Sequence, residues 1–290
     1  MPNVTANGIQ LEYDTFGDRS SPALLLIMGG GSQMIYWEVE FCELLAKKGR
    51  FVIRFDNRDV GLSTKFDNAG IPDMMAAMQG EPVSLAYTLE DMADDAVGLL
   101  DALGIEKAHI CGASVGGMIA QVISYRHPER VLSLTSIMSS TGNPELPQIK
   151  PEILAEVYKP VPNEREAYIE HNVNMWRKLW SPGFLFDEKR LRTLMAESYD
   201  RSYYPQGMAR QSAAALVHGY RKASIASIKT PTLVIHGDQD PFMSVEGGKE
   251  TAQLITGAKL LIIAGMGHDM PKEAWPTIVA AMSNHAAVVS

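Results

Sequence analysis

The sequence predicts an α/β fold in which a mostly parallel β-sheet is flanked by helices and carries a helical cap insertion. Short apolar runs bounded by turn residues alternate with segments of helical periodicity, which is the pattern of parallel strands joined by crossover helices. One long stretch, residues 139–224, interrupts this alternation and contains no clear strand. The chain has 290 residues, 46% of them hydrophobic, so it can bury a sizeable core without disulfides or metals.

The expected strands are apolar or alternating runs that end at turn residues. Residues 9–16 alternate as an edge strand would, and residues 23–28 form an apolar run that stops at three consecutive glycines. The further expected strands are residues 51–55, 108–111, 132–138, 232–236 and 259–264. Together they fit one predominantly parallel sheet.

Helical periodicity fills the intervals between these strands. Residues 89–103 place apolar side chains on one face, begin after an N-cap pattern at Thr88 and stop at Gly104. The further expected helices are residues 38–48, 117–126, 245–254 and 271–285. The stretch 139–224 contains several prolines and then helical segments rich in Trp, Tyr, Met and Arg. We therefore expect a cap domain at 139–224, and a core made of residues 1–138 and 225–290.

The net charge and the composition limit the kinds of binding partner that we expect. The net charge is −8 and the isoelectric point about 5.4, which argues against nucleic acid or an anionic membrane as the main partner. Cys42 and Cys111 are expected to be separate reduced thiols. The N-terminus shows no signal peptide, and the longest apolar run, residues 23–28, is too short to span a bilayer. We expect a cytoplasmic protein without stable membrane association; the oligomeric state stays open, with a homodimer as one option.

The first chemical motif is Gly112-Ala113-Ser114-Val115-Gly116, which matches the pattern G-x-S-x-G. The pentapeptide alone is a weak signal, but here it joins an expected strand to an expected helix. A serine on so sharp a turn takes a strained backbone, so the residues two before and two after it must lack a Cβ. We therefore interpret Ser114 as a nucleophile; the alternative is an ordinary serine in a glycine-rich turn.

A serine hydroxyl needs a base to remove its proton, and the base needs an orienting acid. His268 follows the expected strand 259–264, and Asp240 follows the expected strand 232–236. Both lie where parallel strands end, which is where open α/β sheets place their chemistry. Asp238 competes with Asp240 for the acid role. We favour Asp240, because it lies further into its loop and the following proline fixes the backbone.

The glycines that end the strand at residues 23–28 are candidates for an oxyanion hole. Such a site needs two backbone N–H groups aimed at the developing negative charge, and we assign these to Gly30 and Val115. The alternative is a flexible strand-to-helix loop. A phosphate-binding loop is disfavoured, since neither G-x-x-x-x-G-K-[ST] nor G-x-G-x-x-G is present.

The order of these motifs resembles the α/β-hydrolase superfamily over nearly the whole chain. It is most similar to esterases of the aclacinomycin-methylesterase type in Met28-Gly29-Gly30, the loop at 56–63, the Ser114 motif, residues 230–235, Asp240-Pro241 and Gly265-Met266-Gly267-His268. The chain departs from the wider superfamily in having Met28-Gly29 where His-Gly is usual. The resemblance implies hydrolysis of a small-molecule carboxylic ester through an acyl-enzyme, with no cofactor and no metal.

The glycine triplet also resembles the G-G-G-x turn of some esterases, which implies room for bulky esters, including esters of tertiary alcohols. We expect substrate contacts from the turn and the cap, at Gly29, Gly31, Met175, Trp176, Trp180, Tyr204 and Met208. The alternative for each cap residue is simple packing of the cap onto the core. Two other activities can share the same triad, carbon–carbon bond hydrolysis and cofactor-free haloperoxidase or perhydrolase chemistry. A non-catalytic binding protein is a further alternative, although such proteins typically lose a triad member.

Overall fold

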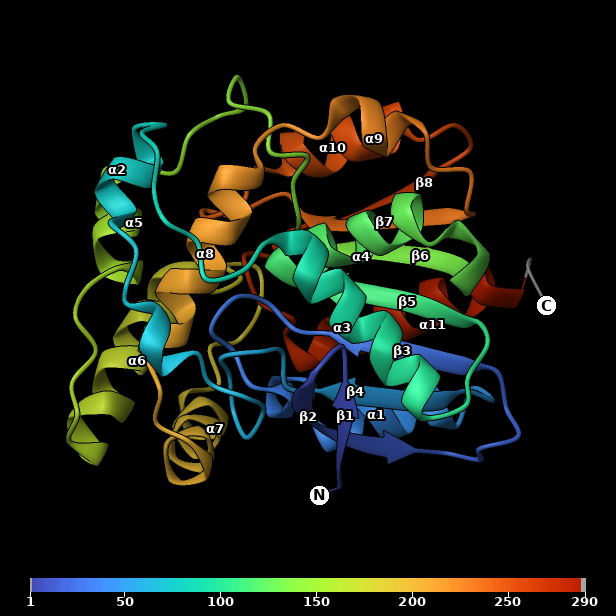
Figure 1. The fold of residues 1–290 in the computed structure, drawn as a ribbon, viewed down its shortest axis with the longest axis horizontal. Helices are drawn as coiled ribbons and strands as arrows, with labels where there is room; N and C mark the ends of the chain where they lie inside the picture. Colours follow the sequence, from blue (N-terminus) through green and yellow to red (C-terminus); the bar gives the residue numbers. More distant parts are fainter. Residues whose placement is uncertain (1, 288–290) are drawn as a thin grey trace.

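The computed structural model describes residues 2–287 and contains an eight-stranded sheet of order β1-β2-β4-β3-β5-β6-β7-β8 (Figure 1). The first two strands run antiparallel to their neighbours and the other pairs are parallel. The strands are β1 (Asn3–Ala6), β2 (Ile9–Phe16), β3 (Ala23–Ile27), β4 (Phe51–Phe55), β5 (Ala108–Ala113), β6 (Val131–Ile137), β7 (Thr232–Gly237) and β8 (Lys259–Ile263). The predicted mostly parallel sheet is confirmed.

The prediction that residues 9–16 form an edge strand is wrong. The edge is β1, which pairs with β2 antiparallel and places Val4 opposite Leu11. β1 is four residues long and only its last residue, Ala6, is buried, so it lacks the apolar run that marks a strand in a sequence. Because β1 covers it, β2 is an inner strand with Leu11 fully buried.

Helices cover both faces of the sheet (Figure 1). The helices that do so are α1 (Val39–Ala46), α3 (Leu89–Ala102), α4 (Val115–Arg126), α10 (Val245–Leu254) and α11 (Trp275–Ala286). The short helix α2 (Met74–Met78) lies away from the sheet and contacts the later helix Gln206–His218. Alternate residues of β3 serve the two faces: Leu25 and Ile27 join the cluster under α3 and α4, while Leu24 and Leu26 join the cluster under α1 and α11. Burial on both faces explains why this strand is apolar at every position.

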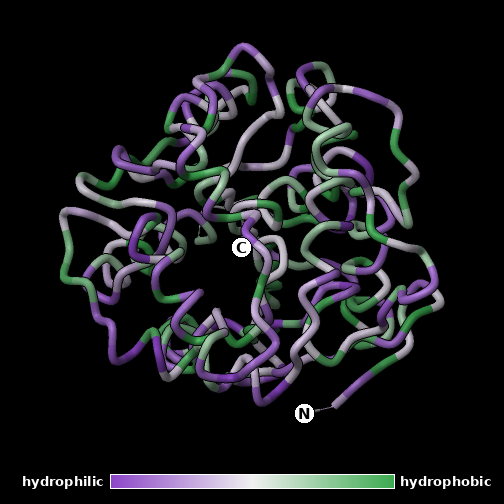
Figure 2. Tube along the Cα trace, turned by 90° about the vertical axis from the view of Figure 1, so that its left-hand side faces the viewer, coloured by the Kyte–Doolittle hydropathy of each residue, from purple (hydrophilic) through white to green (hydrophobic). Residues whose placement is uncertain are grey.

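Between β6 and β7 the chain leaves the sheet and forms five helices: α5 (Pro151–Val157), α6 (Arg165–Leu179), α7 (Glu188–Arg201), α8 (Gln206–His218) and α9 (Lys222–Ala226). The first four lie to the left of the sheet in Figure 1, and α9 packs with α10. Figure 2 looks onto this side, where hydrophilic and hydrophobic residues alternate along the helices as expected when each has one inward face. The predicted helical cap insertion is confirmed.

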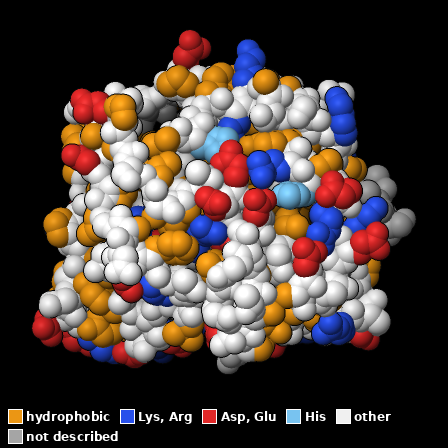
Figure 3. All heavy atoms as spheres, in the orientation of Figure 1, with side chains coloured by type: hydrophobic (Ala, Val, Ile, Leu, Met, Phe, Trp, Pro, Cys, Tyr) orange, Lys and Arg blue, Asp and Glu red, His pale blue; other side chains and the backbone are white. Residues whose placement is uncertain are grey.

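The outer surface carries charges of both signs. On the face drawn in Figure 3, Lys and Arg side chains are interspersed with Asp and Glu side chains rather than gathered into one basic patch. None of the helices within residues 2–287 combines the length and the apolar character needed to cross a bilayer.

Candidate active site

The elbow that carries Ser114 has a strained backbone. Ser114 lies between β5 and α4 with φ 54° and ψ −122°, a positive φ that few non-glycine residues adopt. A Cβ on Gly112 would lie 1.9 Å from the Gly116 carbonyl oxygen, and a Cβ on Gly116 would lie 2.2 Å from the Ile27 carbonyl oxygen. The glycines are therefore required by contact with backbone, as the sequence pattern predicts.

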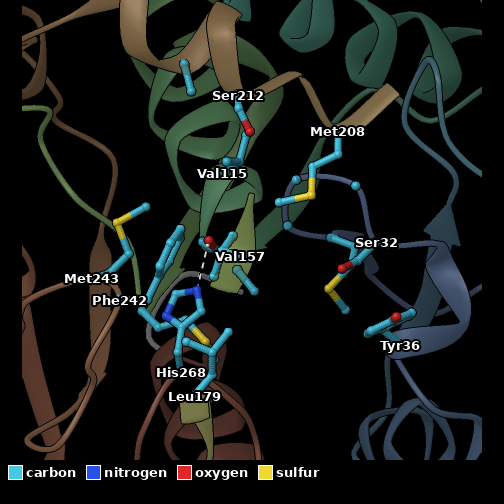
Figure 4. Close-up of a pocket in the computed structure, with 18 of the residues that line it drawn as sticks. Ser32, Tyr36, Val115, Val157, Leu179, Met208, Ser212, Phe242, Met243 and His268 are labelled. Carbon is cyan, nitrogen blue, oxygen red and sulfur yellow. Dashed lines mark hydrogen bonds between the residues drawn. The ribbon is translucent and has the colours of Figure 1, made fainter. Parts of the chain in front are cut away.

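Three loops bring the predicted side chains into one hydrogen-bonded row. The His268 Nδ1 atom lies 2.7 Å from Asp240 Oδ2, and its Nε2 atom lies 3.1 Å from Ser114 Oγ. Figure 4 shows the His268 imidazole among the residues that line the cavity, with a hydrogen bond drawn as a dashed line. Asp238 stands outside the row, because its carboxylate accepts a 2.7 Å hydrogen bond from the Gly265 N–H instead.

The Asp240 side chain is fully buried, yet its carboxylate is held ionised. Burial raises the pKa of its carboxyl group, but His268 and His236 beside it outweigh that effect and hold the pKa at about 2. Its Oδ1 atom accepts backbone hydrogen bonds from Phe242 at 2.9 Å and Met243 at 2.8 Å. A carboxylate fixed in this way can accept the Nδ1–H of His268 and leave Nε2 free to take a proton.

His236 contributes to this arrangement although its sequence context indicates only a buried strand histidine. It lies in β7 and is fully buried, with Nε2 3.4 Å from Asp240 Oδ2 and 2.9 Å from the Met243 carbonyl oxygen. The one sequence signal for this contact is that His236 lies four residues before Asp240. The loop between them turns so that the Asp240 carboxylate lies beside the His236 imidazole.

The glycine turn after β3 lies directly against the elbow. A Cβ on Gly29 would lie 3.1 Å from Ser114 Cβ, and a Cβ on Gly30 would lie 3.2 Å from Val115 Cγ2. Among the described residues no acceptor takes the N–H of Gly30 or of Val115, and both residues line the cavity beside Ser114. Two unsatisfied N–H groups next to a serine hydroxyl can stabilise an oxyanion.

Gly31 differs from its two neighbours, because its N–H is already used. It donates a 2.8 Å hydrogen bond to Gln211 Oε1 in the cap helix α8. A Cβ on Gly31 would lie 2.8 Å from Met208 Cβ, so the space beside this glycine is filled by the cap. The missing side chain at Gly31 thus allows α8 to approach the turn. Room for esters of tertiary alcohols beside Gly29 and Gly30 stays a prediction.

A cavity of about 700 Å³ lies between the core and the cap, within the usual size range of small-molecule sites. It is lined by Ser114 and His268 and by all the residues predicted to contact substrate: Gly29, Gly31, Met175, Trp176, Trp180, Tyr204 and Met208. Two of these have polar groups already engaged elsewhere. Trp180 Nε1 donates to the Leu185 carbonyl oxygen, and the Tyr204 hydroxyl donates to Asp67 Oδ1. These two rings can therefore offer only their apolar surfaces to a ligand.

Asp269 is a second buried carboxyl group at the cavity wall, and no sequence pattern pointed to it. Its Oδ1 atom accepts a 2.5 Å hydrogen bond from the Ser181 hydroxyl, whereas Oδ2 has no partner among the described residues. Burial raises the pKa of this carboxyl to about 6, against the opposing effect of Ser181. The part of the chain that the structure describes has no group of His, Cys, Asp and Glu suited to a metal ion, and Cys42 and Cys111 are free buried thiols.

Comparison with known proteins places the chain among hydrolases. The family model described as "alpha/beta hydrolase fold" matches residues 22–274. Rhodomycin D methylesterase from Streptomyces sp. (strain C5) is 30% identical, with 97% of this chain and 96% of that protein covered, and 3-oxoadipate enol-lactonase 2 from Acinetobacter baylyi is 26% identical, with 90% and 87% covered. A solved meta-cleavage product hydrolase from Pseudomonas fluorescens IP01 has a TM-score of 0.79 at 21% identity, with 100% of this chain and 98% of that chain covered.

Proposed function

We propose that this chain, which belongs to the α/β-hydrolase fold family, hydrolyses carboxylic esters through a covalent acyl-enzyme formed on Ser114. One observation carries the proposal: the Ser114 hydroxyl, the His268 imidazole and the Asp240 carboxylate form a continuous row beside two free backbone N–H groups. This is the arrangement that acyl transfer needs, with a nucleophile, a base, an orienting acid and an oxyanion site within reach of one carbonyl group.

In the first half-reaction, Ser114 Oγ attacks the ester carbonyl carbon while His268 Nε2 takes the hydroxyl proton. The carbonyl oxygen becomes an oxyanion that accepts hydrogen bonds from the N–H groups of Gly30 and Val115. The tetrahedral intermediate then collapses, the carbon–oxygen bond to the alcohol breaks, and His268 gives its proton to the leaving oxygen. Asp240 holds the imidazole in the tautomer that this transfer requires.

In the second half-reaction, water takes the place of the alcohol. His268 removes a proton from the water as it attacks the acyl carbon, and the same two N–H groups hold the second oxyanion. Ser114 leaves with the proton returned by His268, and the carboxylic acid is released. Each proton moves between groups of this chain, the substrate and water.

We assign residues 139–224 to the cap domain, which would select the substrate through the side chains that close the cavity. The cavity of about 700 Å³ has room for a bulky acyl group, and the alcohol would leave beside His268, which protonates it. Because a full-length relative is named a methylesterase, we take methyl esters of bulky carboxylic acids as the first substrate class to test.

The test is a hydrolysis screen of p-nitrophenyl and methyl esters ordered by acyl size, run on the wild type and on Ser114→Ala. The substitution should lower kcat by about 10³-fold or more, with an unchanged melting temperature. A fluorophosphonate probe should label the wild type and leave Ser114→Ala unlabelled. Near-native turnover by a folded Ser114→Ala variant would remove this serine from the mechanism.

A second candidate is carbon–carbon bond hydrolysis with the same triad. It is favoured by the similarity to 2-hydroxymuconate semialdehyde hydrolase from Pseudomonas sp. (strain CF600), which is 31% identical with 68% of each chain covered. Rates on a p-nitrophenyl ester and on a vinylogous diketone would separate the two activities. A kcat/KM at least tenfold higher for the diketone would overturn the assignment as an esterase.

A further inference from the structure

We infer that Gln211, a residue of the cap, is a positioning residue for the oxyanion hole of the core. Its side chain is fully buried, and its Oε1 atom accepts the N–H of Gly31 at 2.8 Å. Gly31 directly follows Gly30, whose own N–H is free to face the substrate. This inference rests on the proposed function, since an oxyanion hole matters only if Ser114 attacks a carbonyl group.

The glycine turn needs an outside contact to hold one shape. The N–H of Ser32 donates to the Gly29 carbonyl oxygen at 3.2 Å, which closes a four-residue turn with Gly30 and Gly31 in the middle. That bond fixes the ends of the turn but not the peptide group between the two central glycines. Glycine pairs have no side chain to restrict this peptide, so it is free to flip unless a neighbour holds it.

Gln211 supplies that neighbour. By accepting the Gly31 N–H, it fixes the central peptide, which stands next to the peptide that carries the Gly30 N–H. A flipped central peptide would change the backbone angles on both of its sides, and with them the separation of the Gly30 and Val115 N–H groups. Correct spacing of these two donors is what stabilises an oxyanion, so holding the peptide should raise kcat rather than substrate affinity.

The Gln211 amide has one orientation that fits. Its Nε2 atom donates to the Arg58 carbonyl oxygen at 2.6 Å while Oε1 accepts from Gly31, so a rotated amide would oppose both partners. The helix beneath is seated equally firmly: a Cβ on Gly207 would lie 2.0 Å from the Asp59 carbonyl oxygen, and Arg210 donates to both Asp59 carboxylate oxygens. The cap therefore presents Gln211 from a fixed position.

The experiment compares Gln211→Met with Gln121→Met. Both glutamines are fully buried and hydrogen-bonded at both ends of the amide, but Gln121 bonds Ser136 and Arg221 and does not touch the glycine turn. Steady-state kinetics on a p-nitrophenyl ester, inhibition by a trifluoromethyl ketone that forms a tetrahedral adduct, and melting temperatures are measured for each variant and for Ser114→Ala.

We expect Gln211→Met to lower kcat by about 10- to 100-fold and to weaken the ketone in parallel, with KM within about threefold of the wild type. Gln121→Met should keep the wild-type kcat even where it lowers the melting temperature. If Gln211→Met does not fold, Gln211→Asn, whose shorter amide cannot reach Gly31 and Arg58 together, replaces it with the same expectation.

Three results would overturn the inference while leaving the proposed function intact: a wild-type kcat for Gln211→Met, a loss confined to KM, or an equal loss of kcat in Gln121→Met. Each of these results counts against the inference only if Ser114→Ala is inactive in the same assay. If Ser114→Ala keeps the wild-type turnover, the proposed function itself fails, and the role of Gln211 fails with it.

Discussion

The core side and the cap side of the cavity are built by different physical means. On the core side the reacting groups are placed by backbone shape, since the elbow glycines at 112 and 116 meet carbonyl oxygens that no side chain could approach. On the cap side the helices are held by buried polar contacts with the core. Arg201 pairs with Asp56 at 2.7 Å and Arg210 pairs with Asp59 at 2.7 Å, and both carboxylates are fully buried.

The difference shows how chemistry and selectivity can be separated within one cavity. A backbone elbow tolerates almost no substitution, so the geometry around Ser114 is fixed by a few glycines. A helical cap held by side chains can change its cavity-lining residues without moving its anchors. The Gln211–Gly31 hydrogen bond crosses this division, because it joins a cap side chain to the backbone of the core.

The strongest way to break the core side is Gly116→Ala. The new Cβ would lie 2.2 Å from the Ile27 carbonyl oxygen and 2.7 Å from that of Met28. Overpacking usually costs 1–3 kcal/mol, but here the obstacle is the backbone of a central strand, so we expect no folded protein in the soluble fraction. The control is Gly257→Ala, because Gly257 also has a positive φ but an added Cβ there would have no atom within 4 Å. This substitution should lower the free energy of unfolding by about 1 kcal/mol. A soluble Gly116→Ala with a wild-type melting temperature would contradict the steric account.

The matching change on the cap side is Arg210→Met. It leaves the Asp59 carboxylate buried with only the Tyr87 hydroxyl and the Phe66 N–H as donors. Breaking a buried ion pair in this way costs about 3–5 kcal/mol. Chemical denaturation would measure the decrease in unfolding free energy. Adding Asp59→Asn should recover part of this decrease, because it removes the buried charge that has lost its partner.

The control for that change is Arg165→Met, which breaks an ion pair with Asp200 in which both side chains are largely exposed. Exposed pairs contribute little to stability, so its melting temperature should stay near that of the wild type. Equal losses from Arg165→Met and Arg210→Met would mean that burial does not set the strength of the cap anchor.

A smaller effect, dependent on pH, is expected from Asp269. Burial raises its pKa to about 6 from an ordinary 3.8, so as the pH rises the unfolded chain loses this proton before the folded protein does. The stabilisation is complete below about pH 4 and is lost as the pH rises through 6. A shift of about two pKa units corresponds to about 3 kcal/mol at most.

Asp269→Asn cannot ionise, so its stability relative to the wild type should increase between pH 4 and pH 7. Unfolding free energies at four pH values across that range would measure the change. Asp240 does not interfere, because its pKa of about 2 confines its own loss of stability to pH values below about 4. A difference between variant and wild type that is constant with pH would contradict the raised pKa.

The core side could be predicted from the sequence because its signals are local. The Ser114 pentapeptide, the strand ends before Asp240 and His268, and the glycines after β3 each occupy a few consecutive residues whose spacing has a steric or chemical reason. The same logic fails for β1, where Asn3–Ala6 has no apolar run, and for the helix expected at 271–285, which begins at Trp275 after a short 3-10 turn at Lys272–Ala274.

The polar contacts of the cap could not be predicted in this way. Gln211 and Gly31 are 180 positions apart, and Arg210 and Asp59 are 151 apart. Whether a glutamine at 211 faces the glycine turn depends on the rotation and seating of α8, which no local pattern encodes. For the aromatic and methionine side chains of the cap, the sequence left open substrate contact or packing onto the core. The structure places Met175, Trp176 and Met208 both along the cavity and against buried apolar clusters.

The finest comparison lies within the cap, between two residues that touch the same glycine. Met208 packs against Gly31 and points into the cavity, as Figure 4 shows, whereas Gln211 bonds the N–H of Gly31. Met208→Ala should enlarge the acyl side and raise kcat/KM for bulky relative to small acyl esters by about tenfold, since a few methylene groups decide selectivity of this size. Its kcat on a small ester should stay within about threefold of the wild type, because loss of the Met208 packing contact leaves the Gly31 N–H bonded to Gln211. Competition assays with paired esters would measure the ratio, and a large loss of kcat in Met208→Ala would mean that packing, rather than the hydrogen bond, holds the turn.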